Sequence, residues 1–301
     1  MPKFAYTEKA FTTATLDTIR DANTIIKEYQ AQGFTLTLRQ LYYQFVSRDL
    51  IPNTMKSYKR IGSVVNDGRL AGLIDWNAIE DRTRNLEAVA SWFSPESIID
   101  SAARGYRTDL WAEQPARIEV WIEKEALAGV FEPICNTLRV PYFCCRGYTS
   151  QSEMWTAAQR LCAYRDQRKK QTPIILHFGD HDPSGMDMTR DIIDRMRVFG
   201  LDLNLTRLAL NMNQVEDYSP PPNPAKMTDS RFEGYVAEYG SESWELDALE
   251  PSVLSELVRK AVTARVDMDA WSESLDREGE DRQLLKVCAE RWGDVVEFLD
   301  Q

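Results

Sequence analysis

The sequence predicts an α/β protein whose first third is mostly helical and whose remainder holds a mainly parallel sheet. Apolar residues recur at helical spacing through the first hundred residues, whereas β-branched segments alternate with amphipathic ones from about residue 115. Such alternation is typical of a parallel sheet with flanking helices. We expect one domain at 1–112 and a second at 113–301, with an acidic helical extension at about 228–301.

Three helices and a polar stretch are predicted before residue 85. The first helix spans about 14–31. The second follows Thr37, whose hydroxyl can cap it, and ends before Pro52. The third spans about 55–71, and the polar stretch 75–84 could form a wing. This order is that of a winged helix-turn-helix, in which the last helix enters a groove of DNA.

The second domain is predicted as alternating strands and helices. Its strands are rich in β-branched and aromatic residues, and Ser184 is the expected N-cap of the third helix. In chain order, the expected elements are 117–123, 126–138, 140–145, 152–167, 173–178 and 184–199, followed by helices at 250–266 and 282–299.

Charge is distributed unevenly along the chain. A net charge of −11 disfavours a polyanionic partner, but residues 228–301 carry 8 Lys and Arg against 19 Asp and Glu. The stretch 39–69 has six basic residues and two acidic ones, so DNA would meet the N-terminal half. The basic side chains of the third helix fit either DNA contact or an ordinary solvated face. These are Lys56, Lys59, Arg60 and Arg69.

Neither export nor membrane insertion is expected. The N-terminus lacks the basic start and apolar run of a secretory signal, and no stretch approaches the ~20 apolar residues that span a bilayer. We therefore expect a cytoplasmic protein. The five cysteines lack a C-x-x-C pair, so we expect small buried side chains rather than disulfides or a zinc site.

Three carboxylates are expected to meet at one edge of the sheet. Glu123 ends one predicted strand, and Asp180 and Asp182 lie just past the end of another. In an open parallel sheet, ligand sites form at the carboxyl ends of the strands. Oxygen ligands of this kind suit Mg²⁺ or Mn²⁺. Alternatively, Asp180 and Asp182 only cap the following helix and its turn, but the neighbouring Glu123 favours the metal site.

The segment 37–43 offers a tyrosine nucleophile. A phenol has a pKa near ~10, so it needs a base or a cation that favours its phenolate. Tyr42 is expected to pack in the core, and His181 to be a local hydrogen-bonding group rather than a ligand. Lys124 could reach a substrate phosphate, or pair with Glu125 or solvent.

These motifs together resemble a known family. Glu-Lys-Glu-Ala at 123–126 and Gly-Asp-His-Asp-Pro-Ser-Gly at 179–185 resemble the two acidic motifs of the Toprim fold. The form is that of the A subunit of topoisomerase VI and its relatives that make meiotic double-strand breaks. The segment 146–150 resembles the family's glycine-containing motif, and 38–43 resembles its nucleophile motif in an N-terminal winged-helix domain. The likeness covers roughly 35–250, and the compact chain is similar to small stand-alone prokaryotic and phage homologues.

The resemblance implies metal-dependent cleavage of double-stranded DNA by tyrosine transesterification. Tyr43 would be joined to a DNA 5′ end, and Arg39, one helical turn earlier, would steady the phosphate or the phenolate. The carboxylates of Glu123, Asp180 and Asp182 would hold Mg²⁺ or Mn²⁺, and that of Glu123 could also transfer a proton.

The resemblance also implies partners. In the family the tyrosine of one subunit works with the metal site of the other, which implies a homodimer. The chain has no glycine-rich ATP-binding motif, so strand passage would need a partner ATPase. Lys124 and Arg146 are further expected DNA contacts. Two alternatives stay open: a hydrolytic Toprim nuclease in which Tyr43 is structural, and a DNA-binding assembly protein without cleavage activity.

Overall fold

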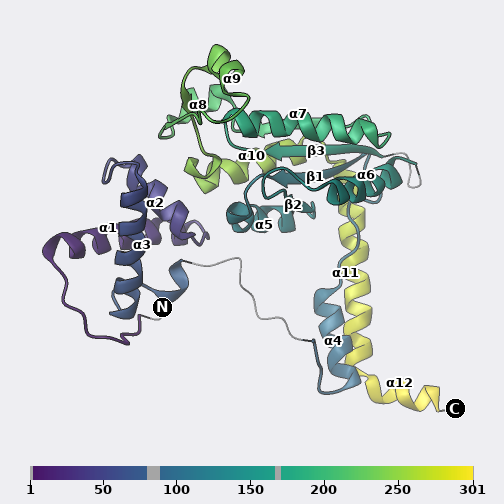
Figure 1. Ribbon diagram of the computed structural model, residues 1–301. Helices are drawn as coiled ribbons and strands as arrows, with labels where there is room; N and C mark the ends of the chain where they lie inside the picture. The colour runs from purple at the N-terminus through teal and green to yellow at the C-terminus, as the bar shows by residue number, and fades with distance from the viewer. Residues whose placement is uncertain (1–2, 80–88, 167–170, 301) are drawn as a thin grey trace.

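The computed structural model describes residues 3–79, 89–166 and 171–300 (Figure 1). A bundle of three N-terminal helices lies beside an α/β region, and a long helical arm extends from the far side of the sheet (Figure 1). The fold class predicted from the sequence is confirmed as α/β with a parallel sheet.

The N-terminal bundle consists of α1 (Thr13–Ala31), α2 (Leu38–Ser47) and α3 (Met55–Leu70). Each helix begins at a threonine whose side chain accepts a backbone N–H of the first turn, which supplies one of the partners that a helix start lacks. The apolar faces of the three helices share one core. Helix α2 ends at Ser47, before Pro52 as expected, and the backbone then turns at Asp49 with φ 55°.

The predicted wing at 75–84 lies partly outside the described residues. Its described part contains a 3₁₀ turn, η1 (Trp76–Ala78), and Ile79 forms one parallel bridge with Leu36. Arg69 fixes this turn by donating to the carbonyl oxygens of Trp76 and Ile79. The winged-helix assignment therefore stays a prediction.

The sheet has four parallel strands in the order β2-β1-β3-β4. Three of the strands were predicted from the sequence within two residues at each end, and β4 was not. In chain order the strands are β1 (Ala116–Ile122), β2 (Tyr142–Cys144), β3 (Thr172–Phe178) and β4 (Asn204–Ala209).

Helices cover both faces of the sheet. Alternate residues of β1 point to opposite faces, so Ile118 and Val120 pack with α5 (Ala128–Thr137) and α10 (Pro251–Thr263). Trp121 on the other face packs with α6 (Gln151–Asp166) and α7 (Pro183–Val198). A sheet buried on both faces explains why its strands read as nearly continuous apolar runs.

The arm pairs two helices that are far apart in the sequence. Helix α4 (Pro95–Gly105) packs against α11 (Met268–Glu290), and α12 (Trp292–Leu299) follows at the tip (Figure 1). The prediction of one helix at 282–299 was wrong, because the helix is interrupted at Arg291, between α11 and α12.

Shorter elements connect the larger ones around the edge of the sheet. In chain order these are η2 (Glu125–Leu127), α8 (Met212–Tyr218), β5 (Asn223–Pro224), α9 (Phe232–Tyr239), β6 (Glu242–Ser243) and η3 (Leu246–Ala248).

All five cysteines are free, but only two are buried as expected. Burial raises the pKa of the Cys135 and Cys145 thiols to about 12. The other three, Cys144, Cys162 and Cys288, are half-exposed.

Candidate functional site

The local sequence of α2 determines where its two tyrosines lie. Thr37 and Gln40 form the predicted cap as a complete capping box, which fixes where the helix begins. Leu41 and Phe45 then face the bundle core. The neighbouring rings of Tyr42 and Tyr43 are buried as well, with 4% and 5% of their surface exposed.

The two tyrosine hydroxyls have different partners. That of Tyr42 donates to Asn53 Oδ1 at 2.8 Å and lies 3.2 Å from the Thr54 carbonyl oxygen, and so ties α2 to the start of α3. That of Tyr43 accepts from Arg39 Nη2 at 3.4 Å. The expectation that Tyr42 packs in the core is confirmed, but Tyr43 packs in the same core and is equally buried.

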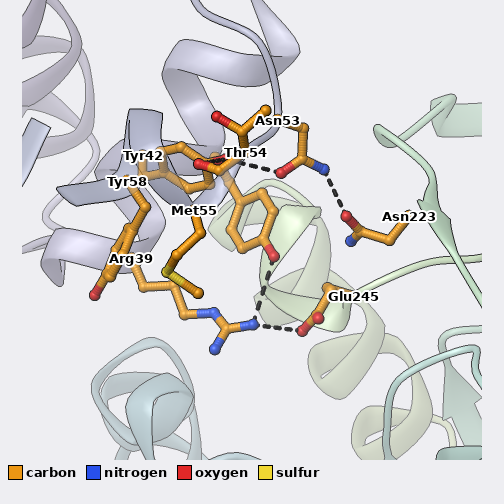
Figure 2. Close-up of a pocket in the computed structure, with 9 residues that line it drawn as sticks. Arg39, Tyr42, Asn53, Thr54, Met55, Tyr58, Asn223 and Glu245 are labelled. Carbon is orange, nitrogen blue, oxygen red and sulfur yellow. Dashed lines mark hydrogen bonds and ion pairs between the residues drawn. The ribbon is translucent and has the colours of Figure 1, made fainter. Parts of the chain in front are cut away.

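Tyr43 lines a pocket of about 300 Å³ between the bundle and the α/β region. Figure 2 shows Arg39 donating to Glu245, and Asn53 donating to Asn223, across this gap. Arg39 is held on both sides, because its Nη2 lies 2.7 Å from Glu245 Oε2 and its Nε lies 2.9 Å from Asp247 Oδ2.

The surroundings of Tyr43 disfavour its phenolate. Burial raises the pKa of the phenol to about 12, and the carboxylates of Asp247 and Glu245 act in the same direction. The guanidinium of Arg39 opposes them, but it does not outweigh them. At neutral pH the Tyr43 hydroxyl is therefore protonated, and its use as a nucleophile requires an added cation or base.

The carboxylates predicted to meet at the sheet edge do come close together. Residues Ile122 and Phe178 are in register on β1 and β3, so the loops after these strands leave side by side. Glu123 Oε2 accepts the backbone N–H of Asp180 at 2.8 Å. Gly185 permits this packing, because a Cβ there would lie 2.3 Å from the Asp180 carbonyl oxygen and 3.1 Å from Glu123 Oε2.

Asp182 caps helix α7, as the alternative interpretation of this motif had it. Its Oδ1 accepts the backbone N–H of Gly185 at 2.6 Å. The expectation that Ser184 caps this helix was wrong, because Pro183 already occupies the first helical position and Ser184 lies inside the first turn.

Asp180 is held by two donors instead. Its Oδ1 accepts the backbone N–H of Leu246 at 2.8 Å and lies 2.8 Å from Lys124 Nζ. Burial raises the pKa of the Asp180 carboxyl, and the adjacent Lys124 ammonium opposes this. Burial outweighs the Lys124 ammonium, so the pKa of this carboxyl stays raised, and the ion pair offsets only part of the cost of burying the charge.

Lys124 is paired with three carboxylates, none of which the sequence suggested. Besides Asp180, its ammonium contacts Glu245 and lies 3.2 Å from Asp247 Oδ1. Burial lowers the pKa of Lys124, but these carboxylates outweigh burial and raise it above the usual range. Neither of the partners expected from the sequence, Glu125 or solvent, is its main contact.

The carboxylates of Glu123, Asp180 and Asp182 suit a hard divalent cation chemically, but they are not arranged as a group of metal ligands. Among the described residues, no group of three or more His, Cys, Asp or Glu side chains is arranged to hold a metal ion. Glu123, Asp180 and Asp182 each accept a backbone N–H through one oxygen, which leaves the second oxygen for a cation. Binding through Asp180 would require Lys124 to release or share that carboxylate.

Arg207 holds the segment 179–185, here called the carboxylate loop, through its backbone. From β4, its guanidinium donates to the carbonyl oxygens of Gly179 at 3.0 Å, Asp180 at 2.6 Å and Gly185 at 3.0 Å. Sequence reasoning missed this residue because β4 itself was not predicted. A basic residue amid the apolar positions of 204–209 was the available signal.

His181 is a structural residue, as expected. It is 1% exposed, its Nδ1 lies 2.7 Å from the Tyr235 hydroxyl, and its ring contacts those of Tyr239 and Trp244. Its backbone also pairs with Trp244, which joins the carboxylate loop to the segment before η3.

The basic residues predicted to contact DNA differ in how they are held; Lys124 is described above. Arg69 is tied to the η1 turn and stacks on Trp76, so it serves the fold. Arg146 is exposed and pairs with Glu125 near the carboxylate loop. The other predicted contacts, Lys56, Lys59 and Arg60, are exposed on α3.

Comparison with protein-family models found no match, and comparison with curated proteins found none either. Within the part of the chain that the structure describes, no helix is long and apolar enough to cross a membrane.

Proposed function

We propose that this chain is a metal-dependent DNA-cleaving transesterase similar to the A subunit of topoisomerase VI. The proposal rests above all on one arrangement. Arg39, beside the Tyr43 phenol, shares Glu245 and Asp247 with Lys124, and Lys124 in turn holds Asp180. A line of alternating charges thus links the nucleophile helix to the carboxylate loop.

Each group has a role in the proposed reaction. The Tyr43 hydroxyl gives up its proton as its oxygen attacks the phosphorus atom, and the bond from phosphorus to the 3′ oxygen breaks. The 3′ oxygen takes up a proton and leaves as a hydroxyl, and the DNA 5′ end stays joined to Tyr43. Arg39 steadies the phosphate or the phenolate. A bound Mg²⁺ or Mn²⁺ would supply positive charge beside the phosphodiester. Glu123, Asp180 and Asp182 would hold that ion, and Glu123 could also transfer a proton.

The proposed substrate is double-stranded DNA, and the proposed active form is a cytoplasmic homodimer. DNA would lie along the exposed basic face of α3, formed by Lys56, Lys59 and Arg60, with Arg146 as a further contact near the carboxylate loop. Lys124 could contact DNA only if it left its three carboxylates. Strand passage would additionally require a partner ATPase, since this chain has no ATP-binding motif of its own.

A second candidate function is a hydrolytic Toprim nuclease. The burial of Tyr43 and the rise of its phenol pKa to about 12 favour it, because both make this tyrosine a poor nucleophile. In that case water attacks the phosphodiester, and Tyr43 only supports the fold of the bundle.

One experiment separates these functions. Wild type, Tyr43→Phe and the matched control Tyr42→Phe are incubated with supercoiled DNA and Mg²⁺, denatured, and tested for protein attached to 5′ ends. We expect an adduct with wild type and Tyr42→Phe, and none with Tyr43→Phe. Cutting by Tyr43→Phe without an adduct would establish hydrolysis. An inert wild-type protein would favour a DNA-binding assembly protein.

A further inference from the structure

The short segment 244–249 belongs to both parts of the molecule. Leu246 and Leu249 are buried in the sheet core, whereas Ala248, between them, is buried in the core of the N-terminal bundle. The following residue, Glu250, accepts a hydrogen bond from Tyr29 on α1. The segment therefore fixes how the bundle sits against the sheet.

Asp247 is the charged centre of this segment. Its side chain is 1% exposed, with Oδ2 lying 2.9 Å from Arg39 Nε and Oδ1 lying 3.2 Å from Lys124 Nζ. One buried carboxylate thus contacts a cation from each part of the molecule. A buried carboxylate is costly unless it is paired, so both cations are drawn to this position.

Both cations lie next to a group of the proposed reaction. Arg39 donates to the Tyr43 hydroxyl, and Lys124 holds Asp180. Glu245 contacts the same two cations, but its side chain is 27% exposed and carries the longer, more mobile stem. Asp247 is therefore the more buried of the two shared anions.

We propose that Asp247 is a positioning residue that sets Arg39 against the Tyr43 phenol and Lys124 against Asp180. The inference rests on the proposed function and deepens it, since one segment holds both the cation beside the nucleophile and the cation beside the carboxylates. Asp247 acts through the two cations, and it does not itself touch DNA. Supporting groups of this kind typically change activity about 10- to 100-fold when they are removed.

Asp247→Asn tests the role because the amide keeps the size of the side chain and loses its charge. At saturating DNA, the rate constant for adduct formation should fall about 10- to 100-fold while DNA affinity stays unchanged. Asp247→Glu should recover part of the rate. With Arg39→Gln, the double variant should lose less than the product of the two single losses, because both changes break the same contact.

Glu119→Gln is the matched control. Glu119 is also buried and ion-paired, through Arg160, but it lies on β1 outside the proposed site. The control should lower stability without lowering the rate constant at saturating DNA. Equal rate losses in the two variants, or no loss in Asp247→Asn, would overturn the positioning role.

A second measurement does not depend on cleavage. With 3-fluorotyrosine at position 43, Asp247→Asn should shift the fluorine resonance, because Arg39 moves and a nearby negative charge is lost. Glu119→Gln should leave the resonance unchanged. A wild-type protein that forms no adduct would refute the proposed function, yet the fluorine shift would still support the alignment of Arg39 by Asp247. An unchanged resonance in Asp247→Asn would refute that alignment whether or not DNA is cut.

Discussion

Helix α2 and the carboxyl edge of the sheet contribute to the candidate site in different ways. On α2, Arg39 and Tyr43 lie one helical turn apart, so local geometry brings them together. At the sheet edge, Glu123 and Asp180 meet only because β1 and β3 are neighbours. The helix presents a buried, protonated phenol, and the edge presents carboxylates, of which Asp180 is paired with Lys124. Neither region is ready for the proposed reaction by itself, and residues 244–249 join them.

Subunit exchange between two inactive variants tests whether the two regions work within one chain or across a dimer, and it should give the largest effect. Tyr43→Phe and Asp180→Asn should each abolish adducts alone. If the tyrosine of one subunit serves the carboxylates of the other, mixed dimers retain one complete half-site and should nick one strand. The measurement is adduct formation on supercoiled DNA after subunit exchange. A mixture that stays inactive would instead place the tyrosine and carboxylates of one chain in the same half-site.

Replacing Lys124 tests how strongly the sheet edge depends on its cation. Lys124→Met leaves three buried or half-buried carboxylates without their shared partner, so unfolding should require about 3–5 kcal/mol less. Urea denaturation provides the measurement. Arg190→Met removes an exposed cation from α7 and should change stability far less, because water already screens its ion pairs. Comparable losses in the two variants would show that the edge does not need this charge.

Added Mg²⁺ tests whether the ion and Lys124 compete for Asp180. If Lys124 and the ion share Asp180, Mg²⁺ should stabilise Lys124→Met more than wild type, because the ion no longer competes with an ammonium group. Urea midpoints with and without Mg²⁺ decide this. An equal increase in both proteins would argue against competition at Asp180.

Acid should destabilise the sheet edge through His177, which lies near the end of β3, just before the carboxylate loop. Burial, with a smaller contribution from Arg207, lowers the pKa of His177 to about 3, against an ordinary value of 6.5. Between these values the unfolded chain binds the extra proton, so stability falls as pH falls. From pH 7 to pH 5 the loss should be about 2 kcal/mol. In urea titrations, His177→Gln should reduce the dependence of stability on pH. An unchanged dependence would show that other groups cause the loss.

The smallest expected effects come from the helix caps of the two regions. Thr37→Ala and Asp182→Ala should each lower stability by about 1 kcal/mol, because each leaves a backbone N–H without its side-chain acceptor. Thermal unfolding measures both. Only Asp182→Ala should also weaken Mg²⁺ binding. If Asp182 acts purely as a cap, Mg²⁺ affinity will be the same in the two variants.

The sequence determined the parts of the fold that depend on neighbours along the chain. Thr37 and Gln40 mark the start of α2 because a capping box is built from residues three apart. The placement of Glu123 and Asp180 at one edge followed from strand ends in a parallel sheet. β4 was missed because half-buried polar positions interrupt its apolar pattern, and α4 because its partner α11 lies far along the chain.

The ion pairs of the candidate site depend on the tertiary structure. Lys124 contacts Glu245 across 121 positions, and Arg39 reaches the same carboxylate across 206. No periodicity spans such separations. The sequence therefore predicted Tyr43 and the acidic motifs as site residues, but it could not indicate a role for Asp247. Ion pairs form where folding brings charges within a few ångströms and removes water from them. That proximity arises only when the bundle packs against the sheet.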